Sequence, residues 1–313
     1  MQDEIRFIPD EEMQFSISDI TALSQTRNWG LDACLIDEFW KVSKGAGVKV
    51  AVLDTGISNH TDLVGAWTIA FNCSSDDSFE DKKSGHGTHV AGIIGARDND
   101  FGVVGVAPEV TIFPIKVLSD TGGGSFQSIE AGIRKAKELG ANIISMSLGS
   151  PVAPPESLHD AIKEAAAAGI IMLAAAGNDS GNVNYPARYD EVIAIAALDQ
   201  NGDLAKFSSR DNTVDAVGPG VDIYSTFLNN QYAKMSGTSQ ACPFIAGICA
   251  LIYSYRRDRP GAQPIANYLD MMKALDEVCD NQYYVSTGHV QPSDTGSWGF
   301  GVPKFANIDW NKI

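Results

Sequence analysis

The stretch Met235-Ser-Gly-Thr-Ser-Gln-Ala-Cys-Pro-Phe-Ile-Ala-Gly247 joins a short polar turn to an apolar helical segment that continues to about Tyr255. Ser239 stands at the junction, where the free N–H groups and the positive dipole end of a helix favour negative charge nearby. Pro243 agrees with a helix here, because a proline in the first helical turns removes little hydrogen bonding. Ser239 is therefore either a simple helix N-cap or a nucleophile, and other segments must decide between the two.

Six apolar runs predict strands that are buried on both faces, as in a parallel sheet. They are residues 48–53, 110–117, 142–148, 170–176, 192–197 and 214–217. Amphipathic helices are predicted between several of these strands, over residues 127–139 and 157–168. Alternating strands and helices favour an α/β fold in which helices cover both faces of a mainly parallel sheet.

Polar residues follow three of the predicted strands, at Asp54, Ser147–Ser150 and Asn178. Sites of open parallel sheets gather where the strands end, so these three segments are expected to share one site. Taken singly, Asp54 and Asn178 have another interpretation as turn-forming residues beside a glycine. Their convergence at one edge of the sheet favours a functional role.

A glycine-rich stretch, Ser84-Gly-His-Gly-Thr-His-Val-Ala-Gly92, predicts a second helix with a histidine at its polar start. Glycine is a poor helix former, so we infer that other parts of the chain approach this backbone closely. His86 and His89 could suggest a metal pair, but no glutamate lies between them and no third ligand is placed, which disfavours zinc. We interpret His89 as a packed, hydrogen-bonded histidine.

The chain of 313 residues carries 39 acidic and 23 basic side chains, which gives a net charge of −16. This charge argues against nucleic acid and anionic membranes as partners. The N-terminus lacks the pattern of a secretory signal, and no apolar run approaches bilayer-spanning length. The five cysteines are odd in number and lack metal-ligand spacing, so we expect free thiols and a cytoplasmic location.

Together, these motifs resemble the subtilisin family of serine peptidases, the subtilases. The matching segments are Val52–Gly56, Gly85–Gly92, Ala175–Asn178 and Gly237–Ala241. The chain order of Asp54, His86 and Ser239 is the order that a subtilisin has. The resemblance covers about residues 24 to 310 and implies an α/β, three-layer α/β/α subtilisin-like fold with a mainly parallel central sheet.

The resemblance implies that Ser239 is the nucleophile of a serine endopeptidase. A hydroxyl is a weak nucleophile and needs a base, and His86 suits that role because the ordinary pKa of histidine is about 6.5. Asp54 would orient the imidazole and stabilise its cation. Asn178 and the Ser239 N–H would donate hydrogen bonds to the oxyanion.

The family pattern also implies a groove that binds substrate as an added strand. One edge would be Gly122, Gly123 and Gly124, and the other Ser147, Leu148 and Gly149. Ala175, Ala176 and Gly177 would form the wall of the pocket for the residue before the scissile bond, and Asn184 would form its floor. An ordinary loop role for Asn184 is the alternative. Tyr185-Pro186 is a candidate cis peptide.

A calcium site is implied by the same resemblance. Its ligands would be Gln25, Asp62, Arg97, Asn99, Phe101 and Val103, with Arg97, Phe101 and Val103 contributing carbonyl oxygens. Oxygen ligands at about six positions suit a hard cation. The alternative is a surface turn rich in Asp and Asn.

Residues 1–23 precede the predicted catalytic domain, residues 24–313. Taken alone, this polar leader could be a disordered tail. Glu4–Pro9 resembles the short segment at the start of intracellular subtilisins, which implies an inhibitory prosegment, although Asp10 stands where those relatives have an aromatic residue. The expected partners are protein or peptide substrates and this N-terminal segment, in a monomer or homodimer. The alternatives are a processing peptidase of narrow specificity and an inactive peptide-binding relative.

Overall fold

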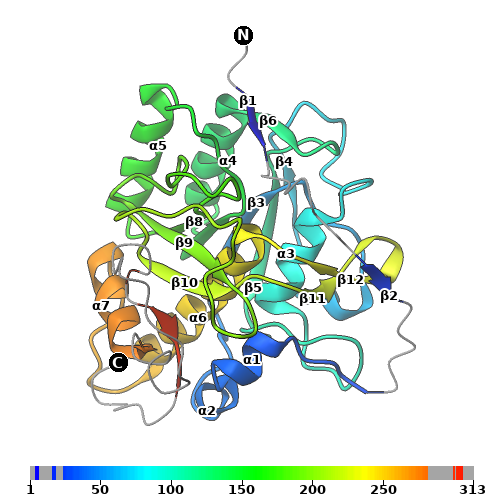
Figure 1. The fold of residues 1–313 in the computed structure, drawn as a ribbon, viewed down its shortest axis with the longest axis vertical. Coiled ribbons are helices and arrows are strands. Elements are labelled where there is room, and N and C mark those ends of the chain that lie inside the picture. The colour runs from blue at the N-terminus through cyan, green and yellow to red at the C-terminus, as the bar shows by residue number, and fades with distance from the viewer. Residues whose placement is uncertain (1–3, 7–15, 19–23, 281–298, 300, 306–313) are drawn as a thin grey trace.

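A seven-stranded sheet forms the centre of the protein (Figure 1). The computed structural model describes residues 4–6, 16–18, 24–280, 299 and 301–305. The strand order is β10-β9-β8-β7-β3-β5-β4, and every neighbouring pair is parallel. The strands are β3 (Lys49–Asp54), β4 (Phe71–Asn72), β5 (Thr111–Lys116), β7 (Ile143–Met146), β8 (Ile171–Ala175), β9 (Val192–Leu198) and β10 (Ala216–Pro219).

The six strands expected from the apolar runs all belong to this sheet. The seventh, β4, has two residues and was not predicted, because so short a segment carries no periodic signal. β7, β8 and β9 are fully buried along their length, as expected of strands covered on both faces. The predicted α/β class and the mainly parallel sheet are confirmed.

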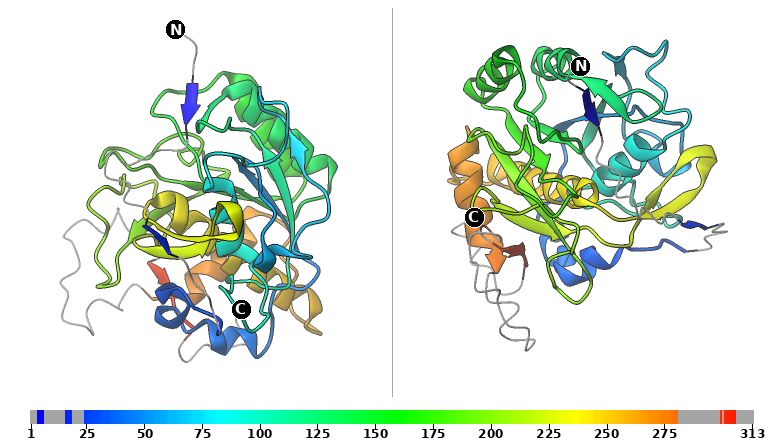
Figure 2. Two further views of the ribbon diagram at one scale, coloured as in Figure 1. Left: turned by 90° about the vertical axis from the view of Figure 1, so that its right-hand side faces the viewer. Right: turned by 45° about the horizontal axis from the view of Figure 1, so that its top comes forward.

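Helices cover both faces of the sheet, as Figure 2 shows. On one face lie α4 (Phe126–Glu138) and α5 (Glu156–Ala167), and on the other α3 (His86–Gly95) and α6 (Thr238–Asp258). Close packing requires glycine on both sides: a Cβ on Gly132 of α4 would meet Val117, and one on Gly95 of α3 would meet Val110. This arrangement is the three-layer α/β/α fold.

Helix α6 lies at the centre of the packing. Every residue from Thr238 to Ile252 is buried, and the helix packs on β7, β8, β9 and β10 as well as on α3. A helix that is apolar on all sides is stable only inside a protein. The start of α6 therefore has a fixed position relative to the ends of the strands.

Smaller elements complete the fold. They are α1 (Trp29–Ala33), α2 (Ile36–Trp40), the 3-10 turns η1 (Thr61–Leu63) and η2 (Leu228–Asn230), β6 (Gly123–Ser125), β11 (Ile223–Thr226), β12 (Tyr232–Met235), α7 (Tyr268–Val278), β13 (Cys279–Asp280) and β14 (Val302–Pro303). Nothing in the sequence pattern predicted the antiparallel β11–β12 pair, whose polar and apolar residues do not alternate clearly. Across the described residues, the structure contains no helix with both the length and the apolar character of a membrane span.

Two short strands of the N-terminal segment pair with the folded domain. β1 (Glu4–Arg6) runs antiparallel to β6, with Ile5 opposite Gly124. β2 (Ser16–Ser18) runs antiparallel to β12, with Ile17 opposite Ala233. The backbone of the leader is thus held at two separate edges.

Candidate active site

Asp54 and His86 form a buried pair at the carboxyl end of the sheet. Asp54 is the last residue of β3, and His86 is the first residue of α3. His86 Nδ1 lies 2.7 Å from Asp54 Oδ1, and the two side chains are 2% and 0% exposed. The N–H of the next residue, Thr55, donates to the same carboxylate oxygen at 2.7 Å, so the adjacent backbone also holds the carboxylate in place.

The surroundings of His86 act on its pKa in opposite directions. Burial alone would lower the pKa of the imidazole, because it penalises the cation. The charge and hydrogen bond of Asp54, with a smaller contribution from the charge of Asp81, outweigh burial, and the pKa of His86 is raised above 6.5. The pair therefore stabilises a proton on the imidazole, as a general base requires.

Asp81 holds the start of the histidine helix, a role that the sequence analysis missed. The N-cap of α3 is Gly85, which offers no side chain for capping and has a φ of 76°. The buried Asp81 carboxylate accepts instead from the Gly85 N–H at 2.9 Å and from the Thr88 N–H at 3.3 Å. Burial raises the pKa of Asp81, while the two backbone N–H groups oppose that rise. An aspartate a few residues before a glycine N-cap was the available signal.

Ser239 lies in the first turn of α6 and is fixed against the end of β7. The Ser239 hydroxyl donates to the Ser147 carbonyl at 3.3 Å, and the Ser147 hydroxyl donates to the Ser239 carbonyl at 2.8 Å. Ser147 directly follows β7, whose Met146 pairs with Leu53, the residue before Asp54. Neighbouring strand ends and the α3–α6 packing thus bring Asp54, His86 and Ser239 to one edge.

Asn178 is oriented by the residue before the serine. Its Oδ1 accepts from both the N–H and the hydroxyl of Thr238, each at 2.9 Å. The side-chain nitrogen of Asn178 therefore points away from Thr238. It lies near Gly237, because a Cβ added to Gly237 would be 3.1 Å from Asn178 Nδ2. The Gly177 N–H donates to the Thr238 hydroxyl at 3.1 Å, which closes the turn.

The predicted pocket wall and floor are in contact. Ala175 and Ala176 are fully buried at the end of β8, and Gly177 follows with a φ of 121°. A Cβ on Gly177 would lie 2.5 Å from Asn184 Nδ2, so the side chain of Asn184 lies directly against this wall. The Asn184 N–H donates to the Ala176 carbonyl at 2.8 Å, and its side chain is 3% exposed.

The two predicted substrate edges differ in form. Gly123 and Gly124 belong to β6, and Gly122 lies in the turn before it with a φ of 83°. Ser147 and Leu148 are buried, and the chain continues through Gly149 to Ser150, which pairs with Tyr185 through two hydrogen bonds of 2.9 Å. The cis peptide predicted at Tyr185-Pro186 is confirmed.

Five of the six predicted calcium ligands converge. Gln25 Nε2 lies 2.9 Å from the Arg97 carbonyl oxygen, 3.3 Å from Asn99 Oδ1 and 3.4 Å from the Val103 carbonyl oxygen. Asn99 Nδ2 lies 3.2 Å from Asp62 Oδ1, and Asp62 is fully buried. Turning the Gln25 side-chain amide around would add its oxygen to the cluster.

Oxygens gathered in this way fit a hard cation. Phe101 joins the described contacts through its N–H, which lies 3.4 Å from Asn99 Oδ1, so its carbonyl remains a predicted ligand. Within the described residues, no three His, Cys, Asp or Glu side chains form a metal cluster. A site here would therefore depend mainly on carbonyl and amide oxygens.

The remaining predictions concern His89 and the cysteines. His89 is buried, and its Nε2 lies within hydrogen-bonding distance of two carbonyl oxygens, those of Ile223 at 3.1 Å and Ala233 at 3.0 Å. It is a packed histidine, as expected. Cys34, Cys73, Cys242 and Cys249 are free thiols, as predicted. Burial raises the pKa of Cys242, on the Ser239 helix, to about 12, so its thiol stays protonated at neutral pH.

Comparison with known proteins agrees with this geometry. The model of the subtilase family matches residues 45–282. The chain belongs to the subtilase family. It is 46% identical over 217 residues to subtilisin DY of Bacillus licheniformis, a match that covers 67% of this chain and 78% of that protein.

Two further relatives differ in how much of them the chain covers. An intracellular serine protease of Paenibacillus polymyxa is 44% identical over 235 residues, or 71% of this chain and 72% of the relative. M-protease of Shouchella clausii (strain KSM-K16) is 41% identical over 240 residues, or 75% of this chain and 62% of the relative. The match to M-protease spans less than two thirds of that relative. The protein is a subtilisin-type serine peptidase.

The Asp54–His86 pair predicts a measurable pH dependence. In a Ser239→Ala background, which prevents self-digestion, NMR titration should give His86 a pKa above 6.5. Asp54→Asn should lower that pKa, because it removes the carboxylate charge and leaves burial in place. An unchanged His86 pKa would contradict the coupling.

The sign of the linked stability follows from the same shift. The folded pKa of His86 is raised above its unfolded value, so protonation of His86 stabilises the fold fully below pH of about 6.5. That contribution is lost as the pH rises through the folded pKa.

Proposed function

We propose that this protein hydrolyses peptide bonds through an acyl-enzyme formed on Ser239. The observation that carries the proposal is the buried 2.7 Å Asp54–His86 contact at the same sheet edge as the start of the Ser239 helix. Ser239 Oγ attacks the scissile carbonyl carbon while His86 accepts its proton, and His86 returns that proton to the leaving amine. Water then repeats the sequence and releases the acid.

Charge develops on the carbonyl oxygen during the attack, and two donors are placed to stabilise it. The Ser239 N–H lies at the N-terminus of α6, where helix N–H groups are free and the dipole is positive. Asn178 Nδ2 is the second donor, since Thr238 holds the opposite end of that amide. Donors fixed before the reaction need no reorganisation during it, which is why such sites are effective.

Substrate would bind by adding a strand to β6. The antiparallel pairing of Glu4–Arg6 with Gly123–Ser125 supports this proposal, because it shows that β6 accepts an extended segment. The wall of Ala175, Ala176 and Gly177 would flank the residue before the scissile bond, with Asn184 beside it and the Ser147–Gly149 edge opposite β6. The buried amide of Asn184 favours a substrate with a polar or small residue before the scissile bond. Such a preference supports a processing peptidase of narrow specificity as the second candidate function.

Replacement of the nucleophile and of the oxyanion donor tests the proposed roles. Ser239→Ala should abolish peptide hydrolysis and retain peptide binding. Asn178→Ala should lower kcat by about 10²–10³-fold, the range known for the corresponding asparagine of a subtilisin. Asn182→Ala, in the exposed part of the same loop, is the matched control and should match wild type. Turnover by Ser239→Ala would exclude this mechanism. Peptide binding without hydrolysis by the variant that begins at residue 24 would instead identify an inactive peptide-binding relative.

We infer that residues 1–23 are an inhibitory prosegment of the catalytic domain formed by residues 24–313. Two observations support this. β1 pairs with the edge of β6 that is proposed to bind substrate. β2 pairs with β12, and β12 leads directly into the turn before Ser239. The intracellular relative and the free thiols of Cys34, Cys73, Cys242 and Cys249 favour a cytoplasmic location. We propose a monomer or homodimer.

Removal of the leader tests its role. A variant that begins at residue 24 should show higher kcat/KM per titrated active site than the full chain, because β6 becomes free for substrate. A synthetic peptide of residues 1–23 added in trans should inhibit that variant competitively. Equal kcat/KM for the two forms would contradict the inhibitory role.

We propose that calcium binds where Gln25, Asp62, Arg97, Asn99 and Val103 converge, with the Phe101 carbonyl completing the set. The ion would bridge these oxygens and hold the loop of residues 97–103 against Gln25, two residues after the leader. Val103 is already tied to this place, since its N–H donates to Asp62 Oδ2 at 2.7 Å. The role of the ion would be structural.

Chelation tests the calcium site. A cation that binds only the folded state at 100 times its Kd stabilises it by about 2.7 kcal/mol, so EDTA should lower the Tm and added calcium should restore it. Asn99→Ala should weaken calcium binding, measured by calorimetry. Asp98→Ala, next in the chain and paired with Lys44 on the surface, should leave the calcium affinity near wild type. A Tm that does not respond to EDTA would refute the site.

A further inference from the structure

Lys116 is a fully buried cation that the proposed mechanism does not use. It is the last residue of β5 and pairs in register with Asp54 at the end of β3. Its side chain is 0% exposed. Lysine is almost never buried to this extent unless its charge is paired, because removing an ammonium from water is costly. The position therefore requires partners, and the structure supplies three.

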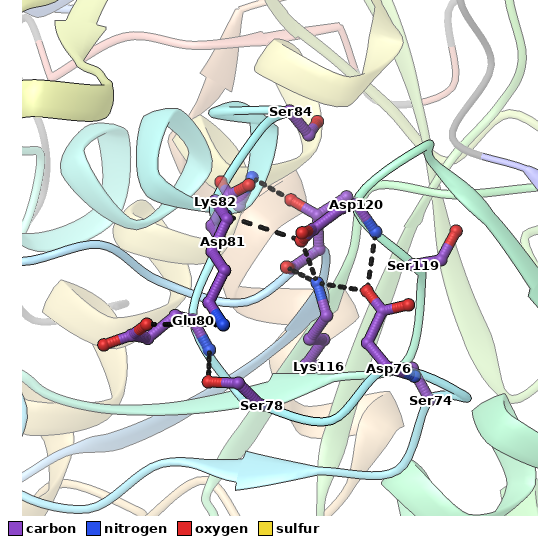
Figure 3. A network of polar contacts seen from close by, with 12 residues as sticks. Ser74, Asp76, Ser78, Glu80, Asp81, Lys82, Ser84, Lys116, Ser119 and Asp120 are labelled. Carbon is purple, nitrogen blue, oxygen red and sulfur yellow. Dashed lines mark hydrogen bonds and ion pairs between the residues drawn. The ribbon is translucent and has the colours of Figure 1, made fainter.

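The ammonium of Lys116 joins three segments of chain (Figure 3). Its Nζ lies 2.5 Å from the Thr55 carbonyl oxygen, 2.8 Å from Asp120 Oδ1 and 3.2 Å from Asp76 Oδ2. Three acceptors match the three N–H donors of an ammonium. Partial burial alone would raise the pKa of Asp120, but Lys116 lowers it below its ordinary value, so Asp120 stays a carboxylate.

The first partner, Thr55, contacts the residues around both members of the buried pair. Its N–H donates to Asp54 Oδ1, and its hydroxyl accepts from the Gly87 N–H, next to His86, at 2.9 Å. The bond from Lys116 to the Thr55 carbonyl thus fixes the backbone that carries these contacts. On this side, Lys116 supports the catalytic geometry.

The second partner, Asp120, begins the turn that leads into β6. Within that turn, the Gly122 N–H donates to the Ser119 carbonyl at 2.8 Å, and the Ser119 N–H donates to the Gly123 carbonyl at 2.8 Å. The backbone of Asp120 also donates to Asp76 Oδ2 at 2.8 Å. Asp76 lies in the loop between β4 and α3, so this contact ties the turn to the segment before His86.

We propose that Lys116 is a positioning residue that sets the substrate edge strand β6 relative to the Asp54–His86 pair, with Asp120 as its contact on the substrate side. One buried ammonium binds the backbone behind the pair and the turn before β6. A shift of either would change the distance from a bound peptide to Ser239. This inference rests on the proposed peptidase function and adds to it the residue that couples substrate binding to the catalytic pair.

The test compares two substrates that end in the same residue before the scissile bond. One is a tetrapeptide anilide that spans β6, and the other is a single-residue ester that does not reach it. Asp120→Ala should lower kcat/KM for the tetrapeptide by about tenfold, mainly through KM, and change the ester by less than about twofold, because only the longer substrate uses the displaced strand. Lys116→Met should lower kcat/KM for both, since it also releases Thr55.

Controls separate this role from a general loss of structure. Asp77→Ala removes one negative charge from the same loop as Asp76, but Asp77 is not among the three acceptors of Lys116, so both substrates should behave as with wild type. The Tm of every variant is measured alongside. The double variant Lys116→Met/Asp120→Ala should lose no more tetrapeptide activity than Lys116→Met alone, because the two residues act as one unit.

Three outcomes would overturn the inference: equal losses on both substrates for Asp120→Ala, no loss on either, or losses that multiply in the double variant. If neither the full chain nor the variant that begins at residue 24 hydrolyses either substrate, the proposed peptidase function itself fails. If the protein hydrolyses both and Asp120→Ala does not discriminate between them, only the positioning role of Lys116 fails.

Discussion

The complete burial of helix α6 is the constraint on which the rest of the structure depends. A helix that packs on four strands and on α3 cannot shift without opening the core. The first turn of α6 must therefore lie at one fixed place along the carboxyl edge of the sheet. The free N–H groups of that turn, the hydroxyl of Ser239 and the oriented amide of Asn178 meet there because the helix is held by its apolar body.

The site also concentrates buried charge, and each charge has a specific partner. Asp54 faces His86, Asp81 accepts from the start of α3, and Lys116 is paired with Asp120 and Asp76. Buried pairs of this kind contribute little net stability compared with apolar packing, but removing one partner is strongly destabilising. Their value is geometric, since hydrogen bonds to charged groups fix the relative positions of loops that apolar contacts would leave free to slide.

Strand edges that pair with the N-terminal segment are a second feature of the domain. β6 and β12 each have an edge on which a further strand forms, and the N-terminal segment supplies both of those strands. An unpaired edge is a template for any extended chain. A peptidase can use such an edge for substrate, and the same chemistry allows its own leader to compete for it.

Sequence patterns were sufficient for six strands of the sheet and the helices that flank it, and they singled out Asp54, His86, Ser239 and Asn178 as candidates. These residues lie within long periodic segments or directly at their ends, where local burial and helix starts are encoded by neighbouring residues. The family resemblance added the roles proposed for these residues, the six predicted calcium ligands and Asn184 as a predicted pocket residue. The structure brings five of the six predicted ligands together and places Asn184 against Gly177.

The sequence alone thus determined the six longer strands of the central sheet, the starts of the helices that flank it and the candidate residues, because hydrophobic periodicity is local. Only the tertiary structure decided that Asp81 caps the histidine helix, that Lys116 joins three loops and that the leader pairs with β6 and β12. Each of these depends on segments far apart in the chain, and the partner of a buried charge or of a strand edge is set by how the layers pack. A lysine at the end of an apolar strand was visible in the sequence, but its three acceptors were not.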